Sequence, residues 1–111
     1  MSQPLFTRIT AFLEVIRELD TTMTVQALQI FTLVAAKGEV GALEIRKTTG
    51  ISQPSVSRSL SALSSWAPRK GVEGLGLIVT ERDPNDARNV IARLTPHGRN
   101  LVSRIEKIMG A

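Results

Sequence analysis

The sequence predicts a mainly helical fold that carries one β-hairpin. Apolar residues repeat at helical spacing along most of the chain, and two short β-branched runs, at residues 77–82 and 89–94, flank a turn. The segment between the runs is rich in Asp, Asn and Pro, which form turns through local side-chain bonds or a preset φ. We therefore expect the order α-α-α-α-β-β-α, with a short extra strand near Val40.

Residues 1–22 are expected to form a helix that mediates dimerisation. Their apolar side chains repeat at spacings of four and three, which is typical of the narrow seam between two paired helices. The alternative is a helix that packs on the core of its own domain. We favour the dimer, because the rest of the chain has enough apolar residues for a core. The seam consists of Leu5, Ile9, Phe12, Ile16 and Leu19.

A second helix is expected over residues 25–37, and it should end at Gly38, since glycine readily adopts the conformation that closes a helix. This segment is apolar on nearly all sides and should form the buried centre. Residues 41–65 then carry a helix-turn-helix pattern, in which Gly50 supplies the positive φ of a tight turn and Ser52 caps the second helix.

The second helix of this pair should read DNA. Val56 and Leu60 repeat on its inward face, so the opposite face is free to enter a major groove. Small or polar side chains on that face would let the helix approach base edges closely. The candidate DNA-binding residues of this helix are Gln53, Pro54, Ser55, Ser57, Arg58 and Ser61.

Residues 76–94 are predicted to form a protruding hairpin, a wing, with Arg82 and Arg88 as its candidate DNA contacts. A last helix should cover residues 96–109, because Thr95 can cap it and Pro96 is tolerated at a first helical position. Its apolar face is expected to join the dimer interface. That face includes Leu101, Ile105 and Ile108.

Three segments resemble the winged helix-turn-helix domain of the MarR family of bacterial transcription regulators. They are residues 50–58 (GISQPSVSR), 83–88 (DPNDAR) and 94–98 (LTPHG), in that order. The resemblance covers residues 41–98 and implies dimerisation through the terminal helices, with Asp86 bracing the wing turn or orienting an arginine. The chain differs in Ala87, where the family often has a second arginine, in a longer link over 66–76, and in a shorter C-terminal part.

Composition agrees with a single DNA-binding domain. The 111 residues carry a net charge of +4 and no cysteine, which excludes disulfides, thiolate chemistry and zinc fingers. Residues 1–40 hold three Lys or Arg and four acidic residues, whereas residues 41–111 hold eleven and six. The basic part thus coincides with the predicted DNA-reading part. No membrane span or signal peptide is visible, so a bacterial cytoplasmic, nucleoid-associated location is expected.

Other features are interpreted as structural. His97 lacks the partners of a metal site or a catalytic base, and Trp66 is expected to close an edge of the core. The serines have no histidine partner, so we expect no enzymatic activity, no catalytic residues, no metal and no cofactor. A small-molecule effector is not favoured, because the chain has three Phe, one Trp and no Tyr.

The sequence therefore predicts a homodimer that binds double-stranded DNA sequence-specifically and regulates transcription as a repressor. One alternative is a DNA-binding protein of plasmid or phage replication or partition, which also uses small winged helices. A second alternative is a winged-helix module for protein–protein contacts alone. Arg58 and Arg88 argue against the second, because they would lie on the two parts that enter DNA grooves.

Overall fold

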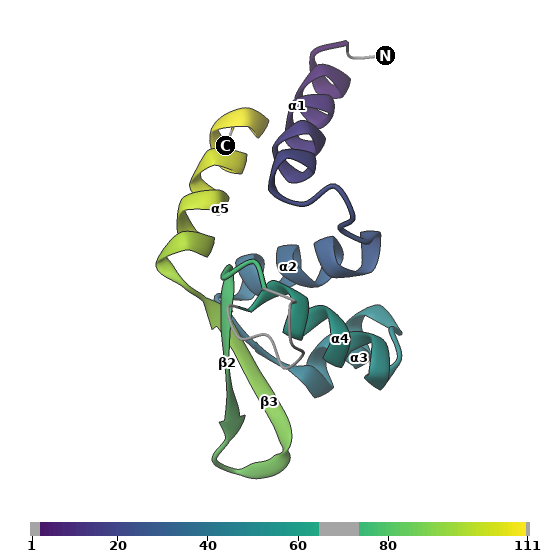
Figure 1. Cartoon of the computed structure of the whole chain (residues 1–111), viewed down its shortest axis with the longest axis vertical. Coiled ribbons are helices and arrows are strands. Elements are labelled where there is room, and N and C mark those ends of the chain that lie inside the picture. The colour runs from purple at the N-terminus through teal and green to yellow at the C-terminus, as the bar shows by residue number, and fades with distance from the viewer. Residues whose placement is uncertain (1–2, 65–73, 111) are drawn as a thin grey trace.

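The computed structural model describes residues 3–64 and 74–110. Trp66 and most of the link predicted over 66–76 lie outside these described residues. The observed order confirms the mainly helical fold with a β-hairpin, including the short strand near Val40 (Figure 1). The elements are α1 (Gln3–Leu19), α2 (Val25–Lys37), β1 (Glu39–Gly41), α3 (Ala42–Thr49), α4 (Gln53–Leu63), β2 (Ile78–Asp83), β3 (Asp86–Leu94) and α5 (Pro96–Met109).

The ends of the helices are fixed by contacts between residues that are close in the sequence. Ser52 and Thr95 are confirmed as N-caps, since their side chains accept the backbone N–H groups of Ser55 and Gly98 at 3.4 and 3.0 Å. Gly50 closes α3 in the left-handed conformation, with φ of 74°. The first helix ends at Leu19 rather than near residue 22, because Asp20 accepts bonds from the backbone N–H and the hydroxyl of Thr22.

The sheet joins the wing to the helix-turn-helix. Its strand order is β1-β3-β2, and both pairings are antiparallel. Ala92 of β3 lies at the centre, opposite Val40 on one side and Thr80 on the other. The β1–β3 ladder ends at the pair of Gly41 and Ile91, so β2 and β3 continue beyond it as a two-stranded ribbon. This ribbon is the wing.

The core forms around α2, as the sequence predicted. Ile30, Phe31 and Val34 of this helix are almost fully buried. They pack in one cluster with apolar residues of α3, α4 and the sheet. These partners include Ile45, Val56, Leu60, Leu63, Leu77 and Ile78.

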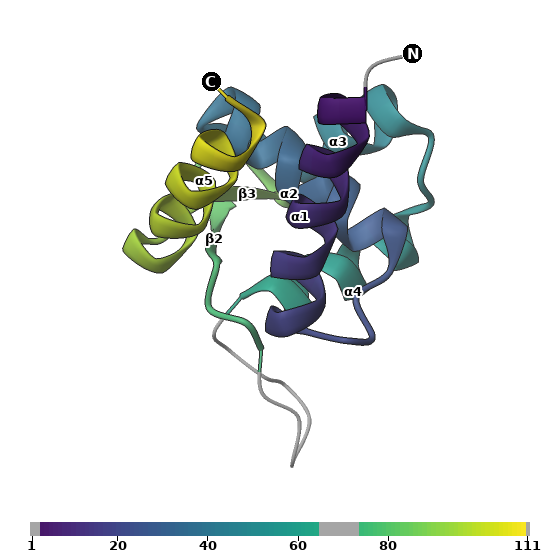
Figure 2. The same cartoon turned by 90° about the horizontal axis from the view of Figure 1, so that it is seen from above.

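The two terminal helices lie side by side at the end of the molecule opposite the wing (Figure 1, Figure 2). An exposed ion pair of 3.3 Å joins Glu18 of α1 to Arg104 of α5. The outer part of α1 leaves large apolar side chains on the surface, with Leu5, Phe6 and Leu13 exposed to 45%, 53% and 49%. Exposed apolar side chains thus gather on the outer part of α1.

Part of the predicted dimer seam faces inward instead. Ile16 and Leu101 are only 6% and 8% exposed within this single chain, so they have almost no surface to offer a partner. The reason is that the second half of α1 lies against the core and α5, where the same apolar repeat is used for internal packing. Leu19, Ile105 and Ile108 are partly buried against that core. Leu5, Ile9 and Phe12 remain exposed or half-buried.

Candidate nucleic-acid interface

Helix α4 is held by its inward face and presents its outward face to solvent. Val56, Leu60 and Leu63 are buried in the core, at the spacing that the sequence predicted for an inward face. The predicted reading residues are all at least partly accessible. Gln53, Pro54, Ser57 and Arg58 are exposed, and Ser55 and Ser61 are half-buried.

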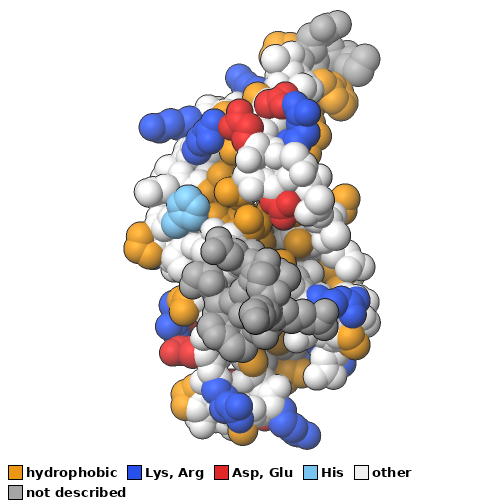
Figure 3. All heavy atoms as spheres, in the orientation of Figure 1, with side chains coloured by type: hydrophobic (Ala, Val, Ile, Leu, Met, Phe, Trp, Pro, Cys, Tyr) orange, Lys and Arg blue, Asp and Glu red, His pale blue; other side chains and the backbone are white. Residues whose placement is uncertain are grey.

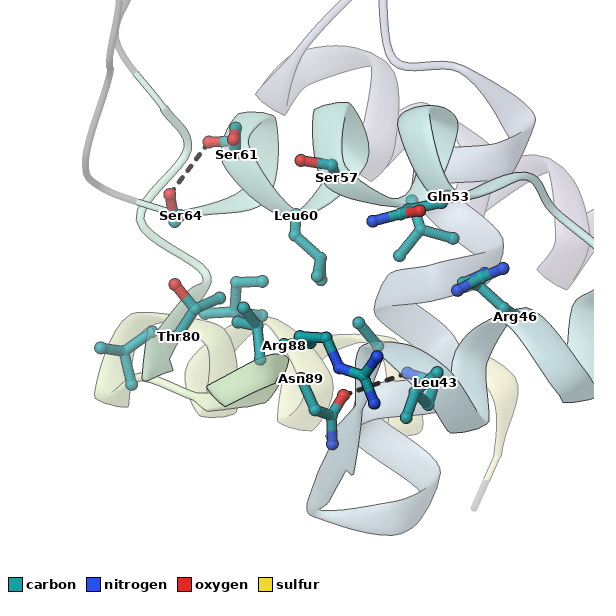
Figure 4. A pocket seen from close by; sticks show the side chains of 15 residues that line it. Leu43, Arg46, Gln53, Ser57, Leu60, Ser61, Ser64, Thr80, Arg88 and Asn89 are labelled. Atoms are coloured by element: carbon teal, nitrogen blue, oxygen red, sulfur yellow. Dashed lines mark hydrogen bonds between the residues drawn. The ribbon is translucent and has the colours of Figure 1, made fainter. Parts of the chain in front are cut away.

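A hollow of about 420 Å³ separates α4 from the wing. Gln53, Ser57 and Ser61 line it along α4, facing Thr80 of β2 and Arg88 of β3 (Figure 4). Its floor is apolar, and its edges carry hydroxyl, amide and guanidinium donors. A surface with donors on two facing edges suits an anionic strand more than a second apolar surface.

Arg58 lies on the other side of the same helix. Its Nη2 atom donates to the Ser55 hydroxyl at 3.2 Å, and both residues line a second hollow next to the connection between α1 and α2. Asp20 lines this hollow as well. The predicted reading residues therefore do not form one flat face: successive residues turn by about 100° around the axis and divide between two sides of α4.

The wing turn presents Arg88 to solvent. Asp86 accepts the backbone N–H of Arg88 at 3.0 Å, and the same oxygen lies 3.6 Å from the Arg88 Nε atom. The Arg88 side chain is nevertheless 93% exposed. Arg82 is exposed on the neighbouring strand. Asp86 thus braces the turn and lies beside an arginine, in the way the resemblance implied.

Arg93, on β3 at the base of the wing, has a different environment. It bonds to Glu81 of β2 and, at 3.0 Å, to Glu39 of β1, so it ties the three strands together. Hydrogen bonds to Glu81 and then to Glu39 raise the pKa of Arg93 above its usual value. A cation with two carboxylate partners has little charge left for a phosphate.

Two residues of this surface were missed by sequence reasoning. Arg46 of α3 is exposed and lines the hollow between α4 and the wing. Its spacing of three from the exposed Leu43 would have placed it on the outer face of α3. Asn89 lines the same hollow and bonds to α3, a contact across 46 residues that no local pattern reveals.

On the face shown in Figure 3, Lys and Arg side chains lie both at the wing end and on the terminal helices, where acidic side chains accompany them. Apolar side chains gather below the terminal helices. His97 is exposed in the first turn of α5 and borders a hollow of about 360 Å³ there.

Within residues 3–64 and 74–110, no group of three His, Asp or Glu side chains could hold a metal ion. No helix of that part is long and apolar enough to cross a membrane.

Together, the capped helix pair, the three-stranded sheet and the protruding ribbon define a winged helix-turn-helix protein. No protein-family model matches the chain, and no curated protein sequence does. Solved structures of MarR-type regulators do share its fold. YusO from Bacillus subtilis superimposes with a TM-score of 0.68 at 18% identity, covering 97% of this chain and 70% of YusO. The chain thus has the MarR-type winged-helix fold.

Two further structures of this type share the fold. NadR in complex with 4-hydroxyphenylacetate matches with a TM-score of 0.67 at 24% identity, over 93% of this chain and 65% of NadR. A mutant MarR from E. coli complexed with operator DNA matches with a TM-score of 0.63 at 18% identity, over 97% of this chain and 75% of that one.

Proposed function

We propose that this chain is a homodimer that binds double-stranded DNA sequence-specifically and represses transcription. The observation that carries the proposal is the arrangement of α4 and the wing on the two sides of one donor-lined hollow. In DNA, one phosphate backbone separates each major groove from the neighbouring minor groove. A protein that inserts a helix into one groove and a ribbon into the other must straddle that backbone.

The polar side chains fit such a strand. In this proposal α4 occupies the major groove and Arg88 enters the minor groove, where a narrow A·T tract strengthens the negative potential. Arg46 and the hydroxyls of Ser57 and Thr80 border the space between them and would contact phosphate oxygens. A MarR structure with the same fold was solved with operator DNA, which supports DNA as the ligand of this chain.

Dimerisation is supported by the surface of α1. Leu5, Phe6 and Leu13 are exposed on one helix, and contiguous exposed apolar surface usually marks an interaction site. We assign the interface to the outer part of the predicted seam, Leu5, Ile9 and Phe12. A two-fold dimer would present its two α4 helices to successive major grooves, about 34–36 Å apart. A cytoplasmic, nucleoid-associated location follows from this function.

The test is selection of bound sequences from a random pool of double-stranded DNA, followed by titration of the selected site at two salt concentrations. We expect a two-fold symmetric site, a preference over unrelated DNA, and weaker binding at higher salt, since released counterions drive phosphate binding. Salt-dependent binding without sequence preference would mean that the protein binds DNA but is not a sequence-specific regulator. The absence of any salt-dependent binding would contradict the proposal.

A further inference from the structure

The side chain of Asn89 connects the wing turn to the first helix of the helix-turn-helix. Its Nδ2 atom donates to Asp83 Oδ2 at 3.0 Å. Its Oδ1 atom accepts the backbone N–H of Leu43, in the first turn of α3, at 3.2 Å (Figure 4). One amide group therefore bonds to both parts that are proposed to contact DNA.

On the side of α3, Asn89 supplies a cap that the helix cannot supply itself. The N-cap residue Gly41 has no side chain, and the first N–H groups of a helix lack intrahelical partners. Asn89, 46 residues further along the chain than Leu43, fills this role. Gly41 also makes room for the amide, because a Cβ atom at this position would lie 2.8 Å from Asn89 Nδ2.

On the side of the wing, Asp83 continues the connection into the turn. Its Oδ1 atom accepts the backbone N–H of Asn85 at 2.8 Å, and its Oδ2 atom accepts the bond from Asn89. The strand register shifts between Arg82 and Asp83, so the turn begins where this carboxylate is held. A series of hydrogen bonds thus connects the wing turn, through Asp83 and Asn89, to α3.

The bonds of Asn89 lie beyond the point where pairing with β1 holds the hairpin. The ladder between β1 and β3 ends at the pair of Gly41 and Ile91, and Arg93 ties the three strands at the base of the wing. Asn89 lies two residues beyond Ile91, towards the tip. Two-stranded ribbons twist and bend readily, so a bond at this point restricts the angle between wing and helices.

We propose that Asn89 is a positioning residue that sets the angle of the wing relative to the helix-turn-helix, through Asp83 on one side and the start of α3 on the other. The consequence for DNA binding rests on the proposed function, in which α4 and the wing enter neighbouring grooves. Arg88 directly precedes Asn89, so a displaced wing carries Arg88 away from its groove while α4 stays in place.

Three variants separate positioning from capping. Asn89→Ala removes both bonds. Asn89→Asp keeps an acceptor for the Leu43 N–H, so the cap of α3 survives. It also places a second carboxylate beside that of Asp83, so the bond that holds the wing turn is lost. The double variant Asp83→Asn with Asn89→Asp restores the donor and acceptor on exchanged residues and leaves the net charge of the protein unchanged.

The first measurement needs no DNA. The chain has no cysteine, so spin labels can be placed at Asn85→Cys on the wing turn and Thr48→Cys on α3. The distance distribution between the labels is measured in the free protein, diluted with unlabelled chain so that distances between subunits do not contribute. We expect a narrow distribution in the parent, a broader or shifted one in Asn89→Ala and Asn89→Asp, and recovery in the double variant.

The second measurement is affinity for the selected DNA site. Asn89→Asp should bind about three- to tenfold more weakly, the factor that one lost hydrogen bond carries, and should lose preference at the base pairs flanking those read by α4. Asn85→Asp is the matched control, because it adds the same charge to the wing turn without touching either bond. The double variant should recover affinity and the flanking preference.

An unchanged label distance in Asn89→Asp would overturn the proposal, even if Asn89→Ala were less stable, because Asn89 would then only cap α3. A double variant as disturbed as Asn89→Asp would also overturn it. If the parent binds no DNA, the proposed function fails, and the label distances still decide whether Asn89 positions the wing.

Discussion

Arg88 combines a fixed backbone with an exposed side chain. Asp86 holds the Arg88 N–H at 3.0 Å, while the side chain is 93% exposed. A guanidinium presented in this way keeps its charge available for a ligand. Replacing Arg88 by Ala should therefore weaken binding to the selected DNA by about 1–3 kcal/mol, the scale of a good specific contact.

Fluorescence anisotropy titration at matched salt measures this loss. Arg17→Ala is the control, since it removes the same charge from an exposed arginine of α1, away from the wing. Both variants should unfold at temperatures close to that of the parent. Equal affinities for Arg88→Ala and the parent would show that the wing does not contact the site.

Arg58 and Arg46 are expected to contact different parts of the DNA. Arg58 lies on the outward side of α4 and can bond both O6 and N7 of a guanine, so Arg58→Ala should relax the preference at one base pair in each half-site. Arg46, at the edge of the hollow, should contact phosphate. Arg46→Ala should lower affinity almost uniformly and reduce the salt slope by about one.

Titrations on the selected site and its single-base variants, at two salt concentrations, separate these two effects. A uniform loss for Arg58→Ala would make Arg58 a phosphate contact only. A change of base preference for Arg46→Ala would assign it to base reading instead.

At the scale of the element, the wing turn depends on one carboxylate. The Asn85 backbone N–H and then the Asn89 amide hold the pKa of Asp83 below its ordinary value of 3.8. A group with a lowered pKa stabilises the fold above its unfolded pKa, and this contribution disappears as the pH falls through the folded pKa. Asp83→Asn should therefore lower Tm at neutral pH, and its difference from the parent should shrink below about pH 4.

Thermal unfolding from pH 7 to pH 3 measures this difference. Asp86→Asn is a useful comparison, because Asp86 is a second carboxylate of the same turn and accepts the backbone N–H of Arg88. A Tm difference that stays constant over the whole range would mean that the Asp83 charge does not stabilise the turn.

Local patterns predicted the elements because their causes are local. Thr95 caps α5 and Gly50 closes α3 by contacts within a few residues, so composition and spacing were sufficient. Asn89 could not be found in this way, because its partner Leu43 is 46 positions distant and comes close to it only when β3 and α3 pack together in the folded chain. Ile16 could not be assigned from sequence for a different reason. An apolar repeat predicts a buried helix face, but it does not show whether that face packs on a second chain or on the core of its own chain.

At the scale of the whole molecule, the hollow beside α5 bears on effector binding. The hollow is bordered by His97 and Arg104, and NadR, which has the same fold, was solved with 4-hydroxyphenylacetate. We still expect no effector of this class, because the chain has only three Phe, one Trp and no Tyr. Neither Tm nor DNA affinity should change with millimolar 4-hydroxyphenylacetate. A rise in Tm that saturates with concentration would contradict this expectation.

The last prediction concerns assembly and follows from which side of α1 is free. Phe12 is half-buried on the outer part of the seam, whereas Ile16 is 6% exposed and packs within the chain. Phe12→Asp should therefore give a folded monomer, because an apolar interface tolerates an unpaired carboxylate badly. Ile16→Asp should lower Tm instead, since the charge enters the core of its own chain.

Sedimentation at tens of micromolar, combined with thermal unfolding, separates the two variants. Thr10→Asp is the control: Thr10 is exposed on α1 outside the seam, so this variant should remain a dimer with the parent's stability. A monomeric Phe12→Asp should also bind a single half-site far more weakly than the parent binds the full site, because the second half-site no longer contributes. A parent that sediments as a monomer with and without DNA would refute the dimer.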